Sequence, residues 1–260
     1  TSSSNASVNT GGVTAIDVHV GKKLIAVAEK SSKVATVQIF EFCAEKREQR
    51  NSKRRRKLIS CSDMQSQEVI CVRFSHDAKF LLIMGGAPDW CLLHYARDKG
   101  RVIHTSRAQT VSSMPFYAGS YCPADSSLMV CTGHKVLKFY RVEASELKPL
   151  PPSMGKREPQ DYTAHCWDTD RRTLVTTEHG DILLFDGGEF RGIIWEMASH
   201  SSSLFSIVSF RKGFICGGDN GALLVFERSD DGAAGTPSTA YRKLNQLTLG
   251  SSNNNNHNHN

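Results

Sequence analysis

The stretch Val69–Thr105 constrains the fold of this chain most strongly; it reads VICVRFSHDAKFLLIMGGAPDWCLLHYARDKGRVIHT. It divides into four short apolar runs, separated by turns that are rich in Gly, Pro, Asp and Ser. Runs of four to six residues are too short for independent helices, and turn residues of these types are typical of hairpins. We therefore expect four antiparallel strands within about 40 residues, which is the size of one propeller blade.

The same four-run pattern recurs along the chain, as a propeller requires, because one blade cannot bury both of its faces. The third runs are the most alike: ATVQIFEF, WCLLHYAR, KVLKFYRV, DILLFDGG and ALLVFERS. We predict an all-β protein, a β-propeller that forms a partial ring of about five four-stranded antiparallel blades, with the third run inside each sheet. The expected blades are 13–61, 69–105, 111–150, 162–196 and 204–249. Residues 1–12 are expected to be a disordered or linking lead, and 250–260 a low-complexity Asn-rich tail.

Composition is ordinary for a soluble globular protein, with 260 residues, 39% hydrophobic and 22% charged. No apolar run reaches about 18 residues, so we expect no membrane span. The chain starts at Thr1 and shows no signal peptide, and we expect a fragment of a longer protein, cut at both ends. Its eight cysteines include no CxxC pair, which favours buried free thiols in a reducing compartment.

The segment Glu45–Lys57 (EKREQRNSKRRRK) accounts for the net charge of +6, because it holds eight Lys or Arg and two Glu. We expect an exposed loop between the third and fourth strands of the first blade. The candidate partner-binding residues are Lys53, Arg54, Arg55, Arg56 and Lys57. Three interpretations stay open: docking on an acidic polymer such as nucleic acid or a microtubule surface, a nuclear localisation signal, or a solvated loop without a specific partner. No aromatic residue interleaves with the segment, so stacking on unpaired bases is not suggested.

A search for catalytic residues yields none. Ser75-His76-Asp77 has the residue types of a triad, but consecutive side chains cannot converge on one site. Gly217–Gly221 resembles a phosphate-binding loop, yet neither Lys-Ser/Thr nor a helix follows it. We expect both to be turns between strands. His257 and His259 in the tail lack a third ordered ligand, so no metal site and no cofactor is predicted.

The string FSHDAKFLL is similar to the FSPDGKxLA element of WD40 repeats, with His76 and Ala78 in place of Pro and Gly. The Trp-Asp dipeptide that usually ends the third strand is missing from every expected blade. Trp167-Asp168 falls at the end of a first strand instead. The resemblance implies a divergent WD40-like β-propeller in which the usual buried Asp-His-Ser/Thr-Trp network is in doubt.

Two longer strings narrow the resemblance: Arg157–Leu184 (REPQDYTAHCWDTDRRTLVTTEHGDILL) and Lys212–Arg228 (KGFICGGDNGALLVFER). They resemble the amino-terminal propeller of the axonemal WD-repeat family of cilia- and flagella-associated protein 57, more than the related proteins 43 and 44. The likeness runs in the same order from about Thr14 to Arg228.

This resemblance implies a non-enzymatic structural scaffold in the axoneme of the motile cilium or flagellum. Such a scaffold assembles or anchors inner dynein arms on doublet microtubules near the nexin-dynein regulatory complex. The implied partners are axonemal proteins, including subunits of those two assemblies, with tubulin as a further candidate. No cofactor, membrane or small-molecule substrate is implied, and nucleic acid is not favoured. The alternatives are a generic WD-repeat interaction hub outside cilia, nuclear through its basic segment, and, more distantly, a propeller enzyme.

Overall fold

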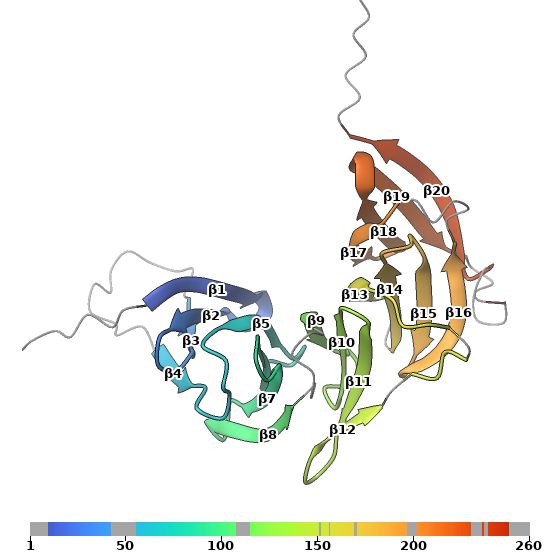
Figure 1. The fold of residues 1–260 in the computed structure, drawn as a ribbon. Coiled ribbons are helices and arrows are strands. Elements are labelled where there is room, and N and C mark those ends of the chain that lie inside the picture. Colours follow the sequence, from blue (N-terminus) through green and yellow to red (C-terminus); the bar gives the residue numbers. More distant parts are fainter. Residues whose placement is uncertain are drawn as a thin grey trace, which may run out of the picture. The chain divides into compact units, whose positions relative to one another are not determined.

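The computed structural model describes residues 10–42, 56–107, 115–150, 152–155, 157–168, 171–196, 202–229, 236 and 239–249. The chain divides into two compact units, 1–159 and 160–260, and each is considered by itself. The described residues form five sheets, each of four antiparallel strands in chain order (Figure 1). The helices among them are single 3-10 turns, η1 (Val20–Lys22) and η2 (Asp219–Gly221). The prediction of an all-β chain of four-stranded antiparallel blades is confirmed.

Three sheets make up the first unit, residues 1–159. The strands of the first sheet are β1 (Thr10–His19), β2 (Leu24–Ser31), β3 (Thr36–Glu41) and β4 (Arg56–Ser60). Those of the second are β5 (Val69–Phe74), β6 (Phe80–Gly85), β7 (Cys91–Ala96) and β8 (Arg101–Arg107). Those of the third are β9 (Phe116–Tyr121), β10 (Leu128–Gly133), β11 (Val136–Val142) and β12 (Leu147–Leu150).

Two sheets make up the second unit, residues 160–260. The strands of the fourth sheet are β13 (Tyr162–Trp167), β14 (Arg172–Thr177), β15 (Ile182–Asp186) and β16 (Glu189–Trp195). Those of the fifth are β17 (Leu204–Phe210), β18 (Gly213–Gly218), β19 (Ala222–Arg228) and β20 (Tyr241–Thr248). In all five sheets the third strand lies between the second and the fourth, as its apolar sequence predicted.

The first strand starts earlier than expected. β1 begins at Thr10, inside the segment 1–12 that was predicted to be a disordered or linking lead. Thr10 pairs with Ser31 of β2, and the register shifts between Thr10 and Val13. Gly12 has a φ of 101°, which glycine adopts without strain, so a bulge carries the ladder past the expected boundary. The tail 250–260 lies outside the described residues.

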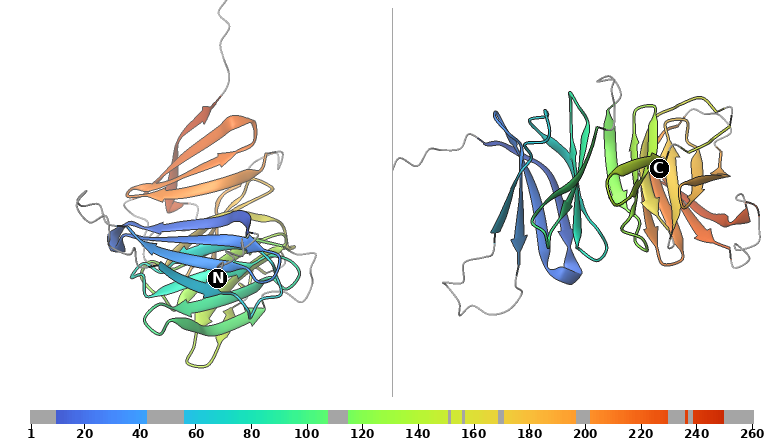
Figure 2. Two further views of the ribbon diagram at one scale, coloured as in Figure 1. Left: turned by 90° about the vertical axis from the view of Figure 1, so that its left-hand side faces the viewer. Right: turned by 90° about the horizontal axis from the view of Figure 1, so that it is seen from below.

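Alternating side chains hold neighbouring sheets of the first unit together. In β6, Leu81 and Ile83 belong to the core shared with the first sheet, while Leu82 and Met84 belong to the core shared with the third. Successive residues of a strand point to opposite faces, so an uninterrupted apolar run serves both cores. β1 lies against β5, and β5 lies against β9. Figure 2 (right) shows these sheets standing side by side.

Polar contacts also join the first two sheets. An Oδ atom of Asp17 in β1 accepts a hydrogen bond of 2.8 Å from the backbone N–H of Phe74 in β5. His19 Nε2 donates to the backbone oxygen of His76 over 2.7 Å, so the β1–β2 and β5–β6 connections lie together.

The seven described cysteines are free thiols, and all but Cys166 are buried. No helix among the described residues is long and apolar enough to cross a membrane.

The outer faces of the first and fifth sheets are apolar and open to solvent. On the first sheet, Ile16 pairs with Val27, and Ile16 is 56% exposed. On the fifth sheet, Val208 pairs with Ile215, which pairs with Val225, and Val208 is 60% exposed. Contiguous apolar area of this kind marks a surface that is normally covered or that causes association.

Residues 1–260 alone are therefore expected to unfold at low temperature or to associate as concentration rises. Sedimentation velocity at increasing concentration, together with thermal unfolding, measures both. Replacing Val208 and Ile16 with Thr, which retains β propensity, should weaken the association. A monomeric chain that unfolds cooperatively at high temperature would contradict this prediction.

Candidate basic docking surface

The predicted partner-binding residues divide between a strand and the residues before it. Lys53, Arg54 and Arg55 lie outside the described residues. Arg56 and Lys57 were expected to lie in the loop. They are instead the first residues of β4, opposite Phe40 and Ile39 of β3. The apolar residues that follow them, Leu58 and Ile59, continue the β-ladder, and the ladder extends back into the basic segment.

Lys57 reaches the neighbouring sheet. Its backbone belongs to β4, and its Nζ lies 5.5 Å from the centre of the Tyr95 ring in β7. Tyr95 is only 2% exposed, so its ring forms a fixed platform under the ammonium group. Lys57 Nζ also lies next to Gly100, 2.6 Å from the position that a Cβ atom would take there. The basic segment therefore ends beside the β7–β8 turn.

That turn brings a second set of cations, which the sequence analysis did not single out. Arg97-Asp98-Lys99-Gly100-Arg101 contains three basic residues and one acidic residue. Arg97 is held in place, because its backbone N–H donates to Lys79 O over 2.9 Å and its guanidinium donates to the Ala78 carbonyl. Lys99 and Arg101 are exposed. The sequence analysis missed that these residues lie close to Lys57, because about 40 residues separate them in the chain.

The β1–β2 connection adds Lys22 and Lys23, both exposed. In an antiparallel sheet the β1–β2 and β3–β4 connections leave the same end, and the bond from His19 to His76 brings the corresponding end of the second sheet beside it. We define the basic end by Lys22, Lys23, Lys57, Lys99 and Arg101. Among the described residues, none of these five cations forms an ion pair with a carboxylate.

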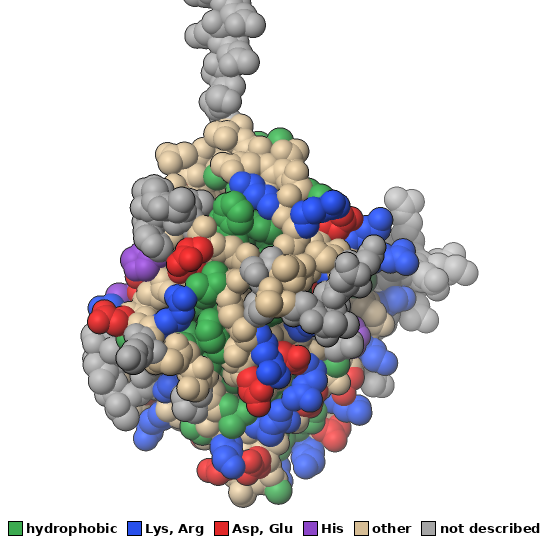
Figure 3. Space-filling view, turned by 90° about the vertical axis from the view of Figure 1, so that its right-hand side faces the viewer, with side chains coloured by type: hydrophobic (Ala, Val, Ile, Leu, Met, Phe, Trp, Pro, Cys, Tyr) green, Lys and Arg blue, Asp and Glu red, His purple; other side chains and the backbone are tan. Residues whose placement is uncertain are grey.

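Cations elsewhere in the first unit are often paired. Lys30 lies 3.0 Å from Glu68, and Arg73 lies 3.6 Å from Asp17. Figure 3 shows another face of the molecule, on which Lys and Arg side chains lie next to Asp and Glu in the lower part of the view. The five cations of the basic end thus differ from these paired cations.

The third sheet does not continue the basic end. Its β9–β10 and β11–β12 connections leave the corresponding end of the sheet and carry Asp125, Glu143 and Glu146. Arg141 pairs with Asp125 at 3.3 Å, and Lys148 pairs with Glu143 at 3.1 Å. The basic end is therefore confined to the first two sheets.

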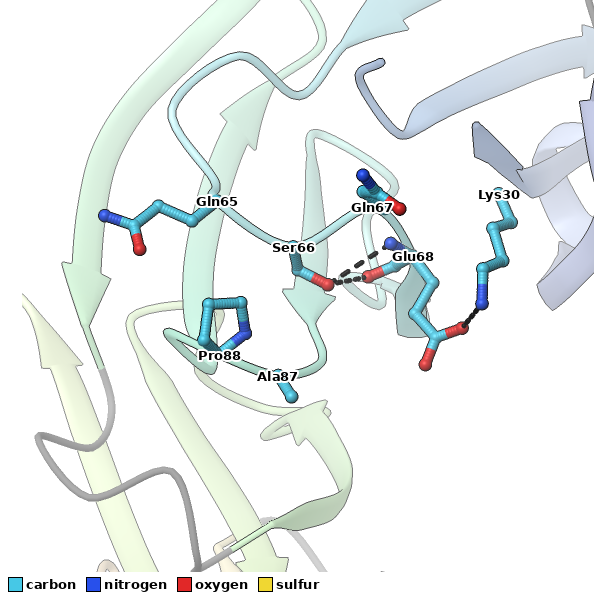
Figure 4. A pocket seen from close by; sticks show the side chains of 7 residues that line it. All are labelled: Lys30, Gln65, Ser66, Gln67, Glu68, Ala87 and Pro88. Carbon is cyan, nitrogen blue, oxygen red and sulfur yellow. Dashed lines mark hydrogen bonds and ion pairs between the residues drawn. The ribbon is translucent and has the colours of Figure 1, made fainter. Parts of the chain in front are cut away.

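A polar pocket of about 330 Å³ lies at the opposite end of the first two sheets (Figure 4). Lys30, the segment 65–68 and the Ala87-Pro88 turn line it. Lys30 is paired with Glu68, and Ser66 Oγ donates to Glu68 O over 2.7 Å. These hydrogen bonds hold the wall of the pocket together, and its lining residues include no nucleophile beside a base.

The two motifs set aside in the sequence are turns, as predicted. Ser75 Oγ donates to Asp77 Oδ1 over 2.7 Å within the β5–β6 connection, and the exposed His76 side chain lies apart from this bond. Gly217–Gly221 ends β18 and passes through η2 into β19, with Asn220 and Gly221 at positive φ.

The second unit contains a buried polar cluster that the sequence did not predict. The Asp168 carboxylate, fully buried, accepts hydrogen bonds from the Arg228 guanidinium, over 3.1 Å at Nε, and from the Tyr241 hydroxyl. The hydrogen bond with Asp168 raises the pKa of Arg228. Burial, and then the hydrogen bond of Tyr241 itself with Asp168, raise the pKa of Tyr241. Asp168 follows β13, whereas Arg228 and Tyr241 belong to β19 and β20. The cluster therefore joins the fourth sheet to the fifth.

Solved structures share this fold. The β-propeller domain of Cps50 (Swd1) from Myceliophteria thermophila matches with a TM-score of 0.68 and 13% identity, over 92% of this chain and 73% of that chain. Saccharomyces cerevisiae Sqt1 matches with a TM-score of 0.66 and 12% identity, over 91% and 62%. At these identities the likeness shows the fold alone, a β-propeller. No protein-family model matches the chain.

Curated proteins narrow the relationship. Mouse cilia- and flagella-associated protein 57 is 25% identical over 265 residues, which covers 85% of this chain and 20% of that protein. The chain is homologous to cilia- and flagella-associated protein 57. The Tetrahymena thermophila protein 57 A is 26% identical over 188 residues, covering 68% of this chain and 14% of that protein. The chain thus spans about a fifth or less of the length of these relatives, and the resemblance to protein 57 in the sequence is confirmed.

Proposed function

We propose that this chain is a propeller region of a non-enzymatic scaffold in the axoneme of the motile cilium or flagellum. The scaffold assembles or anchors inner dynein arms on doublet microtubules near the nexin-dynein regulatory complex. The observation that carries the proposal is the homology to cilia- and flagella-associated protein 57 over 85% of the chain. The names of both relatives support a ciliary location.

The propeller supports a scaffolding role because it offers broad, rigid surfaces. Function resides in sites placed on a fold, and propellers serve many functions. The described residues contain no group of three or more potential metal ligands. The Ser75–Asp77 hydrogen bond closes a turn between two strands, and the exposed His76 takes no part in it. The proposal therefore assigns binding surfaces to this chain and no chemical step.

Axonemes from cells that lack the full-length protein test the proposal. We expect a subset of inner dynein arms to be missing, while the outer dynein arms remain. Mass spectrometry of isolated axonemes measures the dynein subunits directly. Restoring the full-length protein should restore the missing arms, and an unchanged set of inner arms in the deletion would overturn the anchoring role.

Within this function, we assign Lys53, Arg54, Arg55, Arg56 and Lys57 to contact with the doublet or with an acidic neighbour on it. Replacing Lys53, Arg54, Arg55 and Arg56 with Ser is expected to weaken co-sedimentation with microtubules. Each exposed contact contributes no more than about 1 kcal/mol. The four together change the affinity by roughly 10²-fold, and the effect shrinks as salt rises.

The control replaces Lys33 and Arg107 with Ser, which removes two positive charges where the fourfold variant removes four. These two residues lie at the opposite end of the first two sheets, and their loss should leave co-sedimentation unchanged. An equal loss of binding free energy per charge removed in the two sets would reduce the segment to a nonspecific contribution of net charge. Unchanged co-sedimentation of the fourfold variant would show that the segment is solvated and has no specific partner on the microtubule.

One observation favours a second candidate function, a nuclear interaction hub. Lys99 and Arg101 form another basic cluster at the same end as the basic segment. Two basic clusters on one surface suit nucleic acid as well as an acidic protein. The location of the full-length protein distinguishes the two functions.

A further inference from the structure

We propose that the basic end binds an extended, glutamate-rich or aspartate-rich segment of a partner protein. The inference rests on the docking role proposed above and specifies the chemistry of the partner. Its starting point is that five cations from the β1–β2 connection, the start of β4 and the β7–β8 hairpin have no carboxylate partner among the described residues: Lys22, Lys23, Lys57, Lys99 and Arg101. Unpaired charge of one sign gathered on one surface attracts a ligand of the opposite sign.

These cations are held on a rigid frame. Lys57 belongs to β4 and rests on the buried ring of Tyr95. Lys23 has a left-handed backbone, with φ of 53°, and its N–H bonds to Val20 O over 3.0 Å. Arg101 is the first residue of β8. A surface whose backbone is already ordered loses less conformational freedom on binding than a flexible segment does.

The spread of the charges indicates an extended ligand. Lys22 and Lys23 lie at the β1–β2 end, and Lys57 lies on β4 across the same sheet. Neighbouring strands are about 4.8 Å apart, so this distance is roughly 10 to 15 Å. An extended polypeptide covers about 3.3 Å per residue and spans it with four or five residues. A single small anion reaches only one of the clusters.

Two features favour an acidic polypeptide over nucleic acid. Tyr95, the aromatic residue under Lys57, is buried and offers no face on which a base could stack. Carboxylates also lie among and beside the cations: Asp98 is exposed in the same turn, and Glu143 and Glu146 occupy the corresponding end of the third sheet. The continuous negative charge of a phosphate backbone is repelled by these carboxylates, whereas a polypeptide can place neutral residues opposite them.

Binding of two probes to the full-length protein tests the inference: a ten-residue peptide of alternating Glu and Gly with blocked termini, and a single-stranded DNA hexanucleotide, whose five phosphates match the five carboxylates of the peptide. Fluorescence anisotropy at low and physiological salt gives both affinities. We expect the peptide to bind more tightly than the DNA at equal salt. Lys99→Glu together with Arg101→Glu should weaken peptide binding at least tenfold, because two attractions become repulsions.

The matched control is Lys33→Glu together with Arg107→Glu, which changes the net charge equally at the opposite end and should preserve peptide binding. Lys57→Glu provides a second test from another sheet, with thermal unfolding to confirm that each variant is folded. Wild-type affinity in the folded Lys99/Arg101 variant overturns the inference. Tighter binding of DNA through the same residues assigns the surface to nucleic acid. If the peptide fails to bind while the protein still remains with extracted axonemes, the partner chemistry is wrong and the scaffold function stands.

Discussion

Replacement of Asp168 with Ala is expected to lower the free energy of unfolding of the second unit by about 3 kcal/mol. The Asp168 carboxylate is fully buried and accepts hydrogen bonds from Arg228 and Tyr241. Its removal leaves a partly buried guanidinium without its counter-ion and a buried hydroxyl without its acceptor. Such an uncompensated charge costs far more than the loss of an exposed ion pair.

Chemical denaturation of the full chain measures this change in the transition that contains the second unit. Glu227→Ala is the matched control, because Glu227 pairs with the exposed Arg242 at 3.0 Å in the same sheet. That control should cost less than about 1 kcal/mol. Replacing Asp168 and Arg228 together with Leu and Met should recover part of the loss. An Asp168→Ala variant as stable as the Glu227→Ala variant would show that the cluster does not hold the fourth and fifth sheets together.

Acidification is expected to destabilise the first unit through a buried histidine pair. His94 of β7 is fully buried, directly opposite His104 of β8, and their Nδ1 atoms are 3.2 Å apart. Burial, and then the neighbouring His104, lower the pKa of His94 to about 4 from 6.5. The ring packs on Phe80 and on Tyr121 of the third sheet. His94 therefore lies where the second and third sheets meet.

The sign of the effect follows from where the proton binds. Between pH 6.5 and about 4, the unfolded chain protonates His94 and the folded chain does not. Stability is therefore complete above pH 6.5 and falls as pH decreases through this window, by up to about 3 kcal/mol. Denaturation at pH 7 and pH 4.5 measures the difference.

His94→Phe should reduce this acid dependence, since phenylalanine fills the same apolar site and does not titrate. His76→Gln is the control, because the His76 side chain is exposed in the β5–β6 turn, and it should keep the wild-type dependence. Equal slopes in the wild type and the His94→Phe chain would contradict the assignment.

Sequence patterns predicted the sheets because each strand is specified locally. The run CLLHYA is apolar except for His94, and all six residues of β7 are buried. The turn residues of Ser75-His76-Asp77 and Gly217–Gly221 end strands where expected. The early start of β1 was missed because Gly11 and Gly12 carry no apolar pattern, and pairing with β2 alone recruits them.

The surfaces and clusters depend on contacts between residues far apart in sequence. Asp168 lies 60 residues from Arg228 and 73 from Tyr241, so only the packing of the fourth sheet on the fifth reveals the cluster. The only sequence signal near the cluster was the Trp167-Asp168 dipeptide, which ends a first strand and not the third strand where WD40 repeats usually have it. Likewise, the sequence identified Lys57 as part of a charged segment. That Lys99 and Arg101 are its neighbours is visible only in the structure, where Gly100 lies beside the Lys57 ammonium group.

The location of the full-length protein tests the central claim most directly. A fluorescent tag on the full-length protein, expressed at its normal level in a ciliated cell, is followed before and after detergent removes the membrane. The account predicts that the tagged protein remains along the extracted axoneme and leaves the doublets only in high salt. A tagged protein that is found in the nucleus, or that is released with the soluble fraction by detergent alone, would contradict the axonemal scaffold.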